Sequence, residues 1–116
     1  MANPQKGEID LDFAGKTYTC RLTIDSIIRI EDELSKSIIE LALDISNVKG
    51  KLKDLATVLY YGLRNGGNDV DKKEVHRLIE ETGLVKVSTN VANLLSFSLT
   101  DPKERSVGKP QKQPSQ

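Results

Sequence analysis

The chain has 116 residues, carries 17 basic and 17 acidic side chains, and contains a single cysteine. This length fits one domain with a modest core, and the balanced charge argues against nucleic acid or an anionic membrane as partner. One cysteine cannot form an intramolecular disulfide, and the sequence has neither a signal peptide nor an apolar run of membrane-spanning length, so we expect a cytosolic protein.

Two stretches near the N-terminus alternate apolar and polar residues and predict a β-hairpin. Residues 8–13 alternate apolar with acidic side chains, and residues 17–22 alternate again after a tight turn at Ala14-Gly15. Because an isolated hairpin is marginal in water, its apolar face must pack on helices, and a structural role is expected for the cysteine on that face. The residues expected on the inner face are Ile9, Leu11, Phe13, Tyr18, Cys20 and Leu22.

From residue 23 onward the apolar period becomes helical. Thr23 is the expected N-cap of a first helix, whose apolar face contains Ile24, Ile27 and Ile28. A second helix begins at the capping box Ser37–Glu40, with an apolar stripe at residues 38, 41, 42 and 45.

The third helix is expected at Leu52–Arg64, with its apolar stripe at residues 52, 55, 56, 59 and 63. Asn65, Gly66 and Gly67 follow it, and a left-handed glycine commonly closes a helix, so we expect a positive φ at Gly66 or Gly67.

A second capping box at residues 71–74 starts the fourth helix, and Gly83 ends it. A fifth helix is expected over residues 84–99. Residues 101–116 consist largely of Lys, Gln, Pro and Ser, which predicts a disordered tail. The expected fold is therefore one α+β domain over residues 1–100, an N-terminal β-hairpin packed on a small bundle of four to five short helices.

Patterns of catalytic, metal or cofactor sites are missing. His76 is the only histidine and is expected on the solvated side of its helix, and no second histidine or Cys-x-x-Cys pair exists to complete a zinc site. The stretch Asn65–Glu74 fails the ligand spacing of a calcium loop in the registers that start at Asn65 and at Asp69. The helix over residues 72–81 mixes basic residues with three glutamates, which argues against a DNA-reading helix. We therefore expect no enzyme activity, no cofactor and no metal.

Several apolar residues exceed what one packed stripe per helix requires. Two interpretations remain open: the helices are buried on two sides, or they expose an apolar groove for a partner helix. In the second case tyrosine is the better anchor, because it tolerates a half-wet interface. The candidate partner-binding residues are Tyr60, Tyr61 and Leu63, supported by Ile39 or Leu43, with Arg64 at the rim.

The order of several short motifs resembles a phage protein family. The chain opens with Asn-Pro-x-x-Gly-Glu, continues with Gly-x-x-Tyr-x-x-Arg-Leu-Thr, and later has Gly-Leu-Arg before two glycines. It is similar in this to the small tail assembly chaperones of gene transfer agents and siphovirus-type prophages. The matching positions are Asn3, Pro4, Gly7, Glu8, Gly15, Tyr18, Arg21, Leu22, Thr23, Gly62, Leu63 and Arg64.

The resemblance implies a non-enzymatic protein of the bacterial cytoplasm. Such a chaperone binds the tape measure protein, and possibly the tail tube protein, and keeps the tape measure soluble until tube subunits polymerise around it. Two alternatives remain: a structural minor tail or connector protein of a phage-like particle, and a small DNA-binding regulator.

Overall fold

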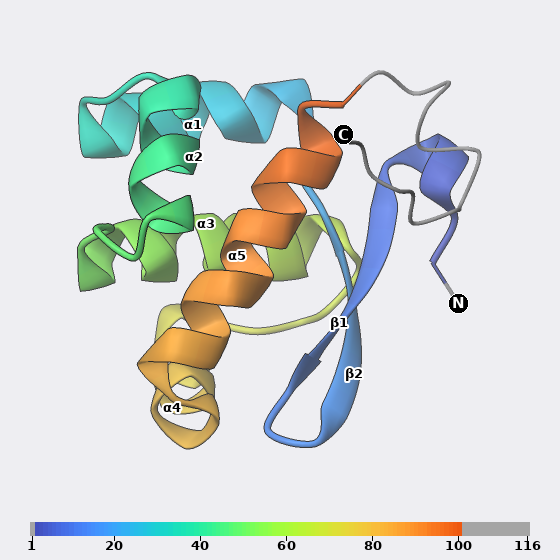
Figure 1. Cartoon of the computed structure of the whole chain (residues 1–116). Helices are drawn as coiled ribbons and strands as arrows, with labels where there is room; N and C mark the ends of the chain where they lie inside the picture. The colour runs from blue at the N-terminus through green and yellow to red at the C-terminus, as the bar shows by residue number, and fades with distance from the viewer. Residues whose placement is uncertain (1, 101–116) are drawn as a thin grey trace, which may run out of the picture.

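The computed structural model describes residues 2–100 and has the predicted α+β fold, a two-stranded hairpin followed by five helices (Figure 1). The predicted tail lies outside the described residues. A short 3₁₀ turn, η1, precedes the hairpin. The elements are η1 (Pro4–Lys6), β1 (Glu8–Phe13), β2 (Lys16–Arg21), α1 (Ile24–Leu34), α2 (Ile38–Ser46), α3 (Leu52–Asn65), α4 (Lys72–Thr82) and α5 (Leu84–Ser98).

The hairpin forms as predicted, with β1 and β2 antiparallel and Leu11 paired with Tyr18. Ala14 and Gly15 both have a positive φ, 54° and 83°, which matches the twist that a two-residue hairpin turn requires. The apolar face packs on α3 and α5, and α5 lies between the hairpin and α2 (Figure 1). The Asn90 side chain on α5 donates a hydrogen bond of 2.7 Å to the Asp12 carbonyl, which ties α5 to β1.

The predicted helix starts are present, with one difference. The Thr23 hydroxyl accepts from the Ser26 amide at 3.1 Å and caps α1, and Asp71 with its partner Glu74 forms a complete capping box on α4. The box predicted at Ser37 is half formed: its hydroxyl accepts from the Glu40 amide at 3.1 Å, but the Glu40 side chain does not return a bond to the Ser37 amide. The Glu31 carboxylate of α1 accepts from the neighbouring Ile38 amide at 2.7 Å, so a tertiary contact also holds the start of α2.

The core surrounds α3, which contacts α1, α4, α5 and β2. Its residues Leu55, Leu59 and Leu63 are buried as predicted, whereas Leu52 is exposed. The prediction for α1 was wrong at Ile24 and Ile28, which are exposed. Helix α1 packs against α2 and α3 on one side only, so its buried stripe is narrower than the apolar face that the sequence predicts. The buried apolar residues of α1 are Ile27 and Ile30.

The end of α3 confirms the glycine prediction at Gly67, whose φ is 99°. Gly66 has an ordinary φ of −81° and serves a different purpose. A Cβ built on Gly66 would lie 1.9 Å from the carbonyl oxygen of Thr19. That residue is therefore glycine because β2 approaches the end of α3 backbone to backbone.

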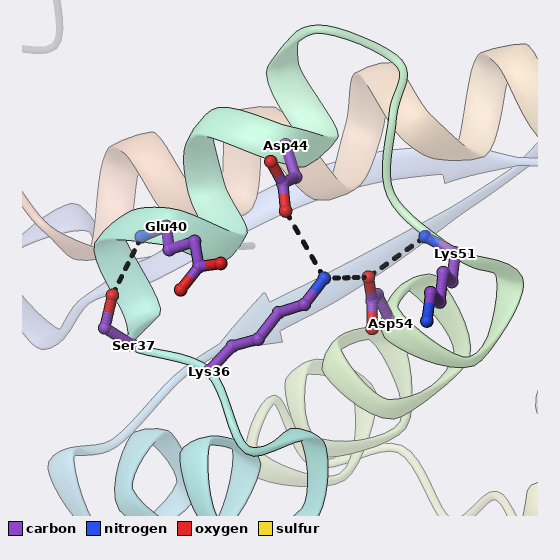
Figure 2. A network of polar contacts seen from close by, with 6 residues as sticks. All are labelled: Lys36, Ser37, Glu40, Asp44, Lys51 and Asp54. Atoms are coloured by element: carbon purple, nitrogen blue, oxygen red, sulfur yellow. Dashed lines mark hydrogen bonds and ion pairs between the residues drawn. The ribbon is translucent and has the colours of Figure 1, made fainter.

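A buried carboxylate joins α3 to the α1–α2 connection (Figure 2). Asp54 is almost fully buried, and its Oδ2 accepts from the Lys51 amide at 2.9 Å and from the Lys36 ammonium at 3.3 Å. The same ammonium lies 3.3 Å from Asp44 on α2. Hydrogen bonds to Asp54 and Asp44 raise the pKa of Lys36, so its charge compensates the buried carboxylate and fixes the start of α3.

Candidate functional site

An apolar groove of about 980 Å³ lies between α3 and α4 and extends to the first residue of α5. Its size is at the upper end of the range for ligand pockets, about 300–1,000 Å³. The side chains along it come mainly from α3 and α4, with one acidic residue from α1. The lining residues are Glu33, Leu52, Lys53, Ala56, Thr57, Tyr60, Tyr61, Lys72, Val75, His76, Ile79, Glu80, Gly83 and Leu84.

Helical spacing explains why these residues share one surface. On α3, two rows at intervals of four residues run along the groove, one from Leu52 to Tyr60 and one from Lys53 to Tyr61. On α4, residues at intervals of three and four form the facing wall, with Val75 and Ile79 buried at its base. The groove therefore has an apolar base and a rim of both charges.

The two tyrosines meet edge to face, with ring centroids 5.3 Å apart and planes at 77°. The Tyr61 hydroxyl donates a hydrogen bond to the Glu33 carboxylate on α1, and this bond, followed by burial, raises the pKa of Tyr61. Tyr60 has two cations near its ring, Arg64 at 6.0 Å and Lys72 at 5.9 Å from the centroid. Both tyrosines are half-buried, so their positions are fixed while part of each ring stays accessible.

The structure brings together some of the predicted binding residues and separates others. Tyr60 and Tyr61 line the groove, and Arg64 lies beside Tyr60, where it pairs with Asp69 at 3.4 Å. Leu63 is 0% exposed, belongs to the core and does not line the groove. Its side chain points away from the groove because it lies on the opposite stripe of α3.

Ile39 and Leu43 on α2 are 58% and 60% exposed but do not line the groove. They form a separate apolar face of α2, whose other side packs on α5. Ile39 and Leu43 therefore lie outside the groove that the two tyrosines line.

Sequence reasoning missed the α4 side of the site. Val75 and Ile79 have the spacing of an apolar stripe, but nothing local tells that this stripe meets α3 at a groove. Leu52 was assigned to the core, yet it lies at the groove margin together with Leu84 of α5. Leu52 and Leu84 are each the first residue of their helix, and a large apolar residue at that position was the one available signal.

The groove offers apolar area and a charged rim for binding, and the groups that could carry metal or thiol chemistry lie apart from one another. His76 lies on the rim and is exposed, and no three His, Cys, Asp or Glu side chains gather within residues 2–100. Cys20 is buried on the inner face of the hairpin, and burial raises the pKa of its thiol to about 12. In the part of the chain that the structure describes, no helix combines the length and apolar character needed to cross a membrane.

A family model described as "Phage tail tube protein, GTA-gp10" matches residues 6–101, which include the hairpin and all five helices. No curated protein and no solved structure matches the chain.

Proposed function

Because the chain belongs to the phage tail tube protein GTA-gp10 family, we propose that it acts during tail assembly as a chaperone of the tape measure protein. In this proposal the chain binds amphipathic helical segments of the tape measure protein in the bacterial cytoplasm. It keeps them soluble until the tail tube forms around them. The family match supports a role in the phage tail, and the resemblance of the sequence motifs to tail assembly chaperones supports the finer role.

The observation that carries the proposal is the groove between α3 and α4. An amphipathic helix binds such a groove through residues at intervals of three and four, which insert between two supporting helices. The half-buried Tyr60 and Tyr61 are suited to anchor it, since aromatic anchors of this kind often cost about 2 kcal/mol or more when truncated. The charged rim favours orientation and fast exchange over tight binding, which suits a partner that is later released to the tube.

A second candidate is a structural subunit of the tail, which the family's description as a tail tube protein favours. A tube subunit has to contact its neighbours through two different surfaces, because head-to-tail contacts build rings and stacks. The exposed apolar residues of α2, Ile39 and Leu43, provide a second surface besides the groove. A structural subunit stays in finished particles, whereas a chaperone does not.

Co-expression with the tape measure protein from the same gene cluster tests the proposal. We expect the wild-type chain to raise the soluble yield of the tape measure protein and the double variant Tyr60→Ala, Tyr61→Ala to lose this effect. Tyr61→Phe keeps the ring and loses only the bond to Glu33, so it should retain the effect. The matched control is Ile24→Ala, which removes exposed apolar area outside the groove.

Circular dichroism of each variant separates loss of binding from loss of fold. If the wild-type chain does not change the solubility of the tape measure protein, the chaperone role is refuted. If the chain is instead found in purified particles in ring-like stoichiometry, the structural role replaces it.

A further inference from the structure

A second, smaller hollow of about 190 Å³ adjoins the groove. Leu52 and Leu84 line both, so the two depressions form one continuous apolar surface. At the far side of the hollow, Val48 and Val85 are 65% and 71% exposed. Large apolar side chains thus gather around a hollow that the fold itself leaves unfilled, which is characteristic of an interaction surface.

Val48 is held in a backbone conformation that valine disfavours. It has a φ of 55° and occupies the position after α2 where a Schellman motif usually has glycine. Both bonds of the motif are present: the Val48 amide donates to the Ile45 carbonyl at 3.0 Å, and the Lys49 amide donates to the backbone carbonyl of Asp44 at 2.7 Å. Core packing does not explain the choice of valine, because the side chain is exposed. Backbone strain at an exposed apolar residue that the core does not need indicates a role in binding a partner.

The surroundings of the hollow are basic. Lys49, Lys51 and Lys53 alternate with its lining residues along the chain, and Lys86 follows Val85; all four lysines are exposed. None of the ion pairs within residues 2–100 involves them. The nearby carboxylates Asp44 and Asp54 are paired with Lys36 instead (Figure 2). This end of the surface therefore favours an anionic partner, whereas the rim of the groove carries both charges.

We infer that the groove and the hollow act as one docking surface, and that its occupant is a partner helix with Asp or Glu beside its apolar stripe. The acidic residues lie at the end of the helix that meets Val48 and Val85, and one apolar side chain of the helix fills the hollow. This inference rests on the proposed function, since it specifies the chemistry of the tape measure segment. The lysines set the direction of the helix in the groove, because reversed docking would leave its carboxylates away from them.

Peptides of about 20 residues, roughly 30 Å as helices, tiled along the tape measure protein of the same gene cluster, provide the probe. Fluorescence anisotropy measures their binding to the full chain at low and high salt. We expect the tightest peptides to carry acidic residues next to an apolar stripe at one end. We expect the double variant Lys49→Glu, Lys86→Glu to weaken them several-fold at low salt and less at high salt. The control variant is Lys16→Glu. Lys16 is exposed at the hairpin turn, away from the docking surface, so this change should leave peptide binding unchanged.

Val48→Gly separates binding from stability. It relieves the left-handed strain, so the melting temperature should rise by several degrees, yet affinity for the same peptides should fall about tenfold, the equivalent of about 1.4 kcal/mol. Unchanged affinity of Val48→Gly, or tightest binding by basic peptides, overturns the inference while leaving the groove as the site. If wild-type chain binds no peptide, the proposed function fails with it. A concentration-dependent dimer in analytical ultracentrifugation that Val48→Gly abolishes would assign the surface to a second copy and also overturn the inference.

Discussion

Gly66→Ala provides the sharpest test of how the hairpin is joined to α3. The added Cβ would lie 1.9 Å from the carbonyl oxygen of Thr19, 2.6 Å from its carbonyl carbon and 2.8 Å from the Cα of Cys20. All three atoms belong to the backbone, so no side-chain rotation relieves the clash. Alanine readily adopts the φ of −81° found here, and the expected cost comes from this contact alone.

Relief of the clash requires β2 to move away from the end of α3. Overpacking of this kind costs about 1–3 kcal/mol. The movement also weakens the hydrogen bond of 2.8 Å from the Asn68 side chain to the same half-buried Thr19 carbonyl, and loss of such a bond costs up to about 1 kcal/mol more. The expected total is about 1–4 kcal/mol, which lowers the melting temperature by at least about 4 °C for a domain of this size.

Thermal and urea unfolding followed by circular dichroism measure the effect. The matched control is Gly67→Ala one residue later, where a Cβ meets nothing within 4 Å and the cost is the strain of a φ of 99°, about 1–2 kcal/mol. Gly66→Ala should therefore be the more destabilised variant. A melting temperature for Gly66→Ala within about 2 °C of wild type, or above that of Gly67→Ala, would refute the close approach of β2.

Three further predictions concern the core and its polar contacts. Leu11→Ala should reduce the free energy of unfolding in urea by about 2–5 kcal/mol, because Leu11 is buried under the hairpin; a loss below half a kcal/mol contradicts its inward position. The folded pKa of Cys20, about 12 against an ordinary 9.0, means that its contribution to stability is complete below pH 9 and is lost as pH rises toward 12. Cys20→Ala should therefore lose less stability across that range, and iodoacetamide should label the wild-type thiol only on unfolding. Asp54→Ala removes the acceptor of the Lys51 amide and the partner of Lys36, so a loss of at least about 1 kcal/mol is expected, and unchanged thermal unfolding would contradict the cap.

Some of the predicted functional residues could be placed from the local pattern of their own helix, whereas the burial of others depends on elements distant in sequence. Tyr60 and Tyr61 were found because two adjacent tyrosines exceed one apolar stripe, and they do line the groove. Leu63 was chosen for its place in the same motif, but the opposite stripe of α3 is surrounded by α5 and the hairpin. Whether a tyrosine at that interface binds a partner stays a prediction.

The sequence by itself determined the features whose causes lie within a few residues. The alternation of residues 8–13 and 17–22 specifies the hairpin, Thr23 caps α1 through an amide three residues away, and Gly83 ends α4 with a φ of 98°. In each case the interacting groups are neighbours along the chain, so composition and spacing are enough.

Only the tertiary structure decided which apolar residues are buried and which line the surface. Ile24 and Ile28 have the same local pattern as the buried Ile27, yet α1 packs on one narrow side only. In the sequence, Gly66 resembles one of two glycines that end a helix. Its identity depends instead on the close approach of the Thr19 backbone on β2, which leaves no room for a Cβ. Burial and close approach depend on elements distant in sequence, so the groove between α3 and α4 exists only once the chain has folded.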